Sequence, residues 1–285
     1  MCFRCPSVLS IGILLSFGLF CSGAERRVLR VCADPNNLPF SNEQGQGFEN
    51  RIAGIVARDW GAKLEYTWWP ERKSFIKNSL DEGRCDVLMG VPTQMDALET
   101  TRPYYRSTYV FVSRQDRDLQ ISSLADPRLE KWRIGVQIVG DDYAPPANAL
   151  ARRGLAGNLV GYSLFGKYGD DNPPARIMDA VARGDIDVAI VWGPLAGYFA
   201  QRETVPLEIA PVSPAMFRAV PFTYDISLGV RKGDVELKGE LNRVLDRECG
   251  AIQALLIEYG VPQAPAPEGK KACESSQQSS SASSR

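Results

Sequence analysis

The chain has 285 residues, 44% of them hydrophobic, and its 33 basic and 34 acidic residues leave a formal net charge of −1. This length suffices for one large or two medium domains with buried cores. A near-neutral charge without a basic cluster gives no support for nucleic-acid binding, which requires cations to neutralise phosphates. The absence of histidine removes His-based catalytic triads and His-ligated zinc. The sequence therefore predicts a protein that is not an enzyme and carries no cofactor or metal.

The first 24 residues have the pattern of an export signal. Arg4 precedes an apolar run at residues 8–20, and small residues at Ser22 and Ala24 favour cleavage before Glu25. A lipoprotein signal ending at Cys21 is the alternative, although the bulky Phe20 precedes that cysteine. We expect a periplasmic protein.

Export changes the interpretation of the cysteines, because the periplasm is oxidising. Removal of the signal leaves Cys32, Cys85, Cys249 and Cys273, which allow three pairings. Cys32 and Cys85 lie at strands expected to be neighbours. We favour their pairing, with a second bridge between Cys249 and Cys273 that joins the tail to the last helix.

Strand and helix patterns alternate along the chain, which predicts parallel sheets covered by helices. We expect strands at residues 28–33, 64–68, 86–90, 109–113, 133–138, 159–164, 187–192 and 224–231. We expect helices at residues 48–60, 74–82, 148–153, 174–183 and 234–259. The last residues are rich in Ser and Gln, so residues 264–285 are predicted to be disordered.

Two segments, residues 80–90 and 181–193, have the same pattern of helix end, Gly, Asp, apolar strand and Gly. Any strand–helix–strand unit can produce this pattern. The alternative is a pair of similar lobes whose strands end at a shared crevice, where ligands of open α/β sheets bind. In both segments the final Gly is expected to open a loop.

Several motifs resemble known families. Five stretches of the chain resemble the first lobe of type 2 periplasmic solute-binding proteins: LRVCADP (29–35), PF (39–40), GFE (47–49), CDVLMGVPT (85–93) and TRPYY (101–105). Three further stretches resemble the MxaJ and XoxJ family: GVQIVGDDY (135–143), NPPARI (172–177) and VWGPLAGY (191–198). The members of this family are periplasmic binding proteins associated with quinoprotein methanol dehydrogenases.

The resemblance implies an α/β fold of two lobes joined by a two-strand hinge. Lobe 1 would comprise residues 25–112 plus 212–263, and lobe 2 residues 113–211, with crossings near Ser113 and Pro211. It also implies an accessory factor that binds a PQQ-dependent methanol or alcohol dehydrogenase and assists its maturation or activation, with a crevice that accepts a peptide segment or nothing tightly. The alternative is an ABC-type transporter component that captures a small neutral solute.

The chain departs from amino-acid-binding relatives at both ligand anchors. Those proteins hold the ligand carboxylate with an Arg shortly after the strand that here ends at Thr93, but in this chain the first Arg after Thr93 is Arg102. They hold the ammonium with an Asp where this chain has Gly193 and Pro194. A buried zwitterion without partners is costly, so amino-acid binding is disfavoured.

By position, the crevice should be bordered by Asp34, Asn37, Phe40, Gly90, Thr93, Gln137, Gly140, Asp141, Trp192 and Gly193. Asp34 also fits a turn-capping role and Asp141 a helix N-cap. Trp69 breaks the alternation of its strand and is a candidate anchor for a protein partner. No pair of carboxylates is clearly placed in the cleft. Asp142 and Asn172 lie in oxygen-rich runs that lack calcium-loop spacing.

Overall fold

The structure is a computed structural model that describes residues 27–71, 74–93, 95–139, 142–165 and 172–265. The predicted signal at residues 1–24 lies outside these residues, as do Gly140, Asp141, Cys273 and all but the first two residues of the predicted tail. Within the described ranges, no helix is long and apolar enough to cross a membrane.

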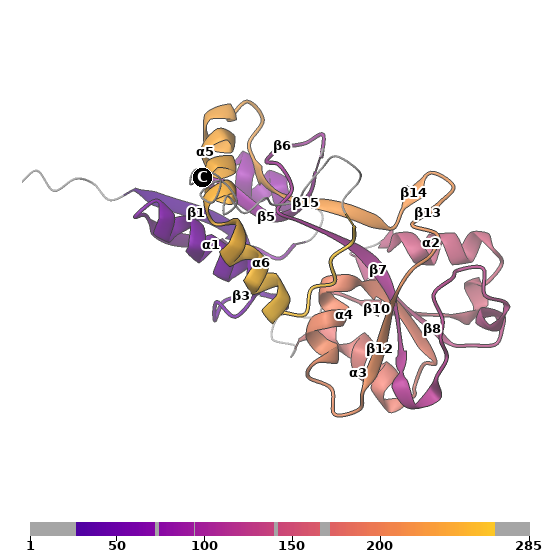
Figure 1. The fold of residues 1–285 in the computed structure, drawn as a ribbon. Coiled ribbons are helices and arrows are strands. Elements are labelled where there is room, and N and C mark those ends of the chain that lie inside the picture. The colour runs from indigo at the N-terminus through magenta and orange to yellow at the C-terminus, as the bar shows by residue number, and fades with distance from the viewer. Residues whose placement is uncertain (1–26, 72–73, 94, 140–141, 166–171, 266–285) are drawn as a thin grey trace, which may run out of the picture.

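Two α/β bodies, here called the first and second lobes, lie side by side in Figure 1 and share one sheet. The strand order is β10-β8-β11-β7-β15-β5-β1-β4. First-lobe strands are β1 (Val28–Ala33), β4 (Lys63–Trp68), β5 (Val87–Pro92) and the short β2 (Asn36–Asn37), β3 (Ser41–Asn42) and β6 (Glu99–Thr100). Second-lobe strands are β8 (Ile134–Val139), β9 (Asp142–Tyr143), β10 (Leu159–Ser163), β11 (Val188–Trp192), β12 (Leu207–Pro211), β13 (Met216–Phe217) and β14 (Val220–Pro221).

Parallel pairing within each lobe confirms the expected α/β class. In the first lobe, β1 pairs in parallel with β4 and β5. In the second lobe, β8 pairs in parallel with β10 and β11. The carboxyl ends of these strands therefore meet between the lobes, where open α/β sheets bind their ligands.

The lobes are joined by two antiparallel strands, β7 (Tyr105–Arg114) and β15 (Thr223–Val230). The first part of β7 pairs with β15, and from Tyr109 onward it pairs with β11. Val212 and Phe222 are buried in the core of the second lobe. We therefore place the crossings at residues 105–108 and 223–226, which corrects the positions expected near Ser113 and Pro211. The expectation failed because β7 is a ten-residue strand that serves both lobes.

Helices cover the sheet in both lobes (Figure 1). The α-helices are α1 (Phe48–Asp59), α2 (Pro145–Arg152), α3 (Arg176–Arg183), α4 (Gly193–Ala200), α5 (Val235–Arg247) and α6 (Cys249–Glu258). Short 3₁₀ turns lie at Gln115–Arg117, Pro127–Glu130, Ala156–Asn158 and Pro173–Ala175, and one π-turn lies at Lys77–Asp81.

Three helix expectations differ from the structure. The single helix expected at residues 234–259 is two helices, because Glu248 leaves the helical region with φ −95° and ψ 9°. Gly193 begins α4 rather than a loop, since Pro194 occupies a first-turn position where its missing N–H costs nothing. In the helix expected at residues 74–82, Phe75 and Ile76 are α-helical and Lys77–Asp81 forms a π-turn.

The two similar segments found in the sequence occupy equivalent places in the lobes. Asp86 directly precedes β5, and its N–H donates to the carbonyl of Arg30 in β1 at 2.9 Å. Asp187 precedes β11, and its N–H donates to the carbonyl of Arg133 beside β8, also at 2.9 Å. Each carboxylate also accepts from an Arg side chain. This equivalence favours similar lobes over an incidental pattern.

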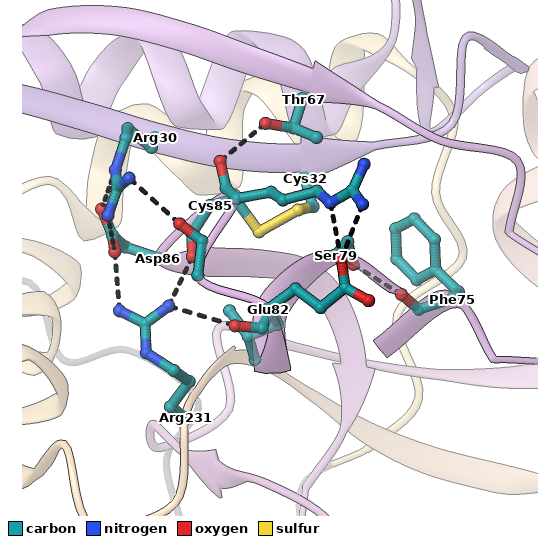
Figure 2. The surroundings of a disulfide bond; sticks show 12 residues. Arg30, Cys32, Thr67, Phe75, Ser79, Glu82, Cys85, Asp86 and Arg231 are labelled. Atoms are coloured by element: carbon teal, nitrogen blue, oxygen red, sulfur yellow. Dashed lines mark hydrogen bonds and ion pairs between the residues drawn. A yellow bond between two sulfur atoms is a disulfide. The ribbon is translucent and has the colours of Figure 1, made fainter. Parts of the chain in front are cut away.

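Cys32 and Cys85 form a disulfide, the pairing that the sequence favoured (Figure 2). The bridge joins β1 to the turn before β5 and packs in a small buried cluster with Leu80, Leu88 and Leu98. Beside it, Asp86 accepts hydrogen bonds from both Arg30 and Arg231, each at 2.7 Å (Figure 2). These guanidinium groups lower the pKa of Asp86 despite its partial burial.

Cys249 is also disulfide-bonded. Its expected partner, Cys273, lies outside the described residues, so the second pairing stays a prediction.

A third connection between the lobes follows α6. Ser107 of β7 donates its hydroxyl to the carbonyl of Pro262 at 2.6 Å, and the N–H of Ala264 donates to the carbonyl of Arg106 at 2.9 Å. The rings of Tyr198 on α4 and Tyr259 stack with centroids 5.6 Å apart. We call residues 259–264 the strap. It packs the end of the first lobe against α4 of the second.

The strap requires a glycine on α4. A Cβ atom added at Gly197 would collide with the backbone carbonyl of Gly260, which a flexible side chain cannot relieve. We predict that Gly197→Ala lowers the free energy of unfolding by about 1–3 kcal/mol, as overpacking does elsewhere. Urea unfolding measures this change.

Gly250→Ala is the matched control, since nothing lies within 4 Å of a Cβ at that helical position. It should keep or slightly raise stability, because Ala is a better helix former than Gly. Equal stability of Gly197→Ala and the wild type would contradict the packing described for the strap.

Candidate functional site

A cavity of about 400 Å³ lies between the lobes, within the usual range of small-molecule sites. We call it the cleft. Its residues come mostly from the ends of strands that meet at this edge of the sheet. They are Asn37, Phe40, Glu49, Glu71, Met89, Gly90, Pro92, Tyr105, Tyr109, Gln137, Val139, Leu164, Phe165, Trp192, Leu195, Tyr224 and Ile226.

Aromatic rings form the wall of the cleft at the hinge. Trp192 at the end of β11 lies 5.3 Å from the ring of Tyr109 on β7 and 5.8 Å from that of Tyr224 on β15. On the first lobe, Phe40 packs edge-on against Phe48 of α1 at 5.4 Å. Both strands that connect the lobes therefore contribute rings to one wall.

Glu49 brings a carboxyl group to the first-lobe side of the cleft. It lies in the first turn of α1 and keeps only 9% of its surface exposed. Burial, followed by repulsion from Glu71, raises the pKa of Glu49 well above its ordinary value. Its position depends on Gly90, which has φ +68° and whose missing side chain leaves the space that the Glu49 carboxylate fills.

Glu71 supplies a second carboxyl group, just after β4. The residue as a whole is exposed to solvent. Its carboxyl group, however, lies against the first lobe and accepts a hydrogen bond from Asn37 Nδ2 at 3.0 Å. Loss of hydration of the carboxyl against the protein, followed by repulsion from Asp34, raises the pKa of Glu71 to about 7. The hydrogen bond from Asn37 acts in the opposite direction.

Gln137 faces the cleft from β8 on the second lobe. Its residue is 1% exposed, and its Oε1 accepts the N–H of Trp192 at 2.9 Å. Its Nε2 has no hydrogen-bond acceptor among the described residues. An unpaired buried donor costs free energy, so this amide is a candidate ligand contact.

The described residues around the cleft include neither the Arg nor the Asp that would hold an amino-acid ligand. No Lys or Arg is among the described residues that line it. Arg102, the first Arg after β5, instead pairs with Asp246 on α5. Where an ammonium-binding Asp would follow β11, α4 begins with Gly193. Among the described residues, the cleft therefore has acidic groups and no cationic side chain that would hold a carboxylate.

Comparison with known proteins identifies the architecture. Residues 29–256 match the model of the bacterial extracellular solute-binding proteins, family 3. The chain belongs to this family. Within it, the protein is an MxaJ/XoxJ-like periplasmic binding protein.

Curated relatives support this narrower grouping. Protein MoxJ of Methylorubrum extorquens is 34% identical over 250 residues, which cover 83% of this chain and 82% of the relative. Protein MoxJ of Paracoccus denitrificans is 32% identical over 259 residues, which cover 85% and 91% of the two chains.

Two solved structures of the same group have the same fold. Periplasmic binding protein XoxJ from Methylobacterium extorquens AM1 is 36% identical with a TM-score of 0.69, covering 84% of this chain and 100% of that one. MxaJ from Methlophaga aminisulfidivorans MPT is 28% identical with a TM-score of 0.71, covering 83% and 100%. The fold class predicted from the sequence is confirmed.

Five of the residues predicted for the crevice of this family-3 protein line the cleft: Asn37, Phe40, Gly90, Gln137 and Trp192. Gly140 and Asp141 lie outside the described residues.

The other predicted crevice residues are placed elsewhere. Asp34 accepts the N–H groups of Asn36 at 2.8 Å and Glu71 at 2.6 Å, which is the turn-capping alternative. Thr93 bonds to the hydroxyl of Ser227 at 2.6 Å and so joins β5 to β15. Gly193 packs against β7 at the start of α4.

Trp69 is half-buried, and the Arg84 guanidinium lies 5.3 Å from its ring centroid. Its backbone N–H donates to the carbonyl of Ala33 at 3.0 Å, which continues the pairing of β4 with β1. No described contact tests its proposed role as a partner anchor.

Sequence reasoning missed the two glutamates of the cleft. Glu49 lies in the GFE motif, and its place in the first turn of a predicted helix gave no indication that it lines the cleft. Glu71 follows the end of β4, so the strand-end argument that selected Asp34 applied to it equally. The expectation that no carboxylate pair is placed in the cleft is corrected by the structure.

Among the described residues, no three Cys, Asp or Glu side chains come together as a potential cation site.

The raised pKa of Glu71 predicts a pH-dependent stability. Its folded pKa of about 7 exceeds the ordinary 4.5, so between these values the folded protein binds more protons than the unfolded chain. Stability should fall as pH rises through this range. We predict that Glu71→Gln reduces the drop in melting temperature between pH 5 and pH 8, as measured by thermal unfolding.

Asp34, Asn37 and Glu49 surround Glu71, and Glu49 should keep part of the pH dependence in the variant. Glu236→Gln, at an exposed position on α5, is the control and should retain the wild-type drop. Identical pH profiles for Glu71→Gln and the wild type would show that the Glu71 carboxyl is not perturbed.

Proposed function

We propose that this protein is a non-catalytic periplasmic accessory factor that binds a PQQ-dependent methanol or alcohol dehydrogenase and assists its maturation or activation. The relatives MoxJ, XoxJ and MxaJ support the grouping. The observation that carries the proposal is the chemistry of the cleft. It retains the geometry of a binding protein, and its described residues include neither of the two groups that would hold a free amino acid.

The described residues of the cleft do not form the catalytic arrangement of a hydrolase or transferase. Among the described residues that line it, there is no Ser, Cys, Lys or Thr to act as a nucleophile. No described residue forms a hydrogen bond with the Glu49 carboxyl that would orient it for proton transfer. These features support a binding role over a catalytic one.

Capture of a solute for a membrane transporter is the second candidate. It is favoured by the cavity volume of about 400 Å³ and by the apolar rings around it. Closure of the lobes about the hinge strands would then enclose the solute. A thermal-shift screen distinguishes the two functions, because a ligand at 100 times its dissociation constant stabilises by about 2.7 kcal/mol.

Affinity capture from periplasm tests the accessory role. We predict that tagged protein recovers a quinoprotein dehydrogenase from methanol-grown source cells, quantified by mass spectrometry. Trp69→Ala should reduce this recovery by about tenfold or more if Trp69 anchors the partner, as buried interface tryptophans do.

Trp132→Ala is the matched control, because Trp132 is also half-buried with an Arg, Arg128, 5.1 Å from its ring. Absence of any quinoprotein dehydrogenase from the wild-type capture would contradict the accessory role. Equal losses of recovery for Trp69→Ala and Trp132→Ala would contradict only the role of Trp69 as the partner anchor.

A further inference from the structure

We propose that the cleft binds an ammonium or guanidinium group carried on an aliphatic chain, with the cation at Glu49 and Glu71 and a neutral oxygen of the same ligand at Gln137. This inference deepens the binding role and rests on the proposal that the cleft is the binding site. It replaces the neutral solute expected from the sequence with a cationic one.

The first step is the state of Glu49. This side chain lines the cleft, is 9% exposed, and has neither an ion-pair nor a hydrogen-bond partner among the described residues. A buried carboxylate without a counter-charge is costly. A ligand cation would remove this cost by supplying both the charge and the N–H donors.

The second step is the presence of Glu71 beside it. Repulsion between the two carboxyl groups contributes to the raised pKa of Glu49. A single cation placed between them would lower the pKa of both groups. The pair is therefore better suited to a cation than to a neutral hydroxyl compound, which would leave the repulsion unchanged.

The third step is the aromatic wall. Arg side chains lie over six rings in the described ranges, those of Trp60, Trp69, Trp132, Tyr198, Phe217 and Tyr259. None of these rings lines the cleft. Phe40 and Trp192 line the cleft, are only partly buried and carry no described Arg over their rings, so they can contact the alkyl chain and charge of a ligand, an arrangement that favours organic cations.

The fourth step is the opposite wall, where Gln137 Nε2 lacks an acceptor. An amide carbonyl would satisfy it. A Lys or Arg residue inside a polypeptide offers this combination of a side-chain cation and neutral carbonyl groups. A free amino acid instead brings a carboxylate, for which the described lining contains no Lys or Arg.

Calorimetric titration of the purified protein at pH 8 tests the inference with three probes. Nα-acetyl-lysine N-methylamide represents a lysine in a chain, and the corresponding norleucine derivative has the same length without the charge. Pentylamine represents a free amine. We expect the capped lysine to bind at least about tenfold more tightly than capped norleucine.

The relation between the amines identifies the source of the cation. Tighter binding of capped lysine than of pentylamine supports a polypeptide segment, and equal binding supports a free amine as the occupant. Both results support the cationic site. Equal affinity for capped lysine and capped norleucine, or no heat from either amine at about 10 mM, would overturn it.

Variants locate the site. Glu49→Gln should weaken capped lysine by about tenfold or more and leave capped norleucine unchanged, since it removes charge at constant shape. The control Glu236→Gln should change neither affinity. Wild-type affinity for capped lysine in a folded Glu49→Gln protein would overturn the assignment. If this variant does not fold, the comparison of the three probes on the wild-type protein still tests the inference.

Failure of this inference is distinguishable from failure of the proposed function. The titrations use the isolated protein, whereas affinity capture uses periplasm. If the protein captures a dehydrogenase but binds none of the amines, the accessory role stands and the assignment of the cleft as a cation-binding site is wrong.

Discussion

The pairing of β7 with β15 is the constraint on which the rest of the structure depends. Because these two strands cross between lobes, one sheet runs through the whole molecule, and the parallel strands of each lobe end at the same opening. The strap adds a third connection on the side of α4. Rings on β7 and β15 line the cleft, so any rotation of the lobes about these strands would change the shape of the binding wall directly.

Within this frame, the cleft opposes an apolar wall to two carboxyl groups. Such an arrangement is unfavourable in isolation, because burial disfavours the charged forms. It persists because Glu49 is fixed in the first turn of α1 and fits the space left by Gly90. The free energy lost in this way is recoverable on binding a cation. A site preorganised for a cation explains this better than a structural role, because no described residue forms an ion pair with Glu49.

The sequence predicted the fold well and the site in part, for physical reasons. Strand–helix alternation and the neighbouring positions of Cys32 and Cys85 are local or pattern properties, and both were confirmed. Strand-end positions selected Asn37 and Trp192, which line the cavity between the lobes, and their role as ligand contacts stays a prediction. The break at Glu248 and the double use of β7 depend on tertiary contacts that no local pattern carries. Glu49 was missed because a carboxylate in the first turn of a helix is usually favourable to the helix itself, and only the burial of Glu49 shows that it faces a cavity.

A crystal structure with Nα-acetyl-lysine N-methylamide tests the central claim most directly. The account predicts the lysine ammonium at hydrogen-bond distance from the Glu49 carboxylate, its alkyl chain against Phe40 and Trp192, and an amide carbonyl near Gln137 Nε2. A ligand bound outside the cleft, or one whose ammonium points to solvent while Glu49 stays unpaired, would contradict it.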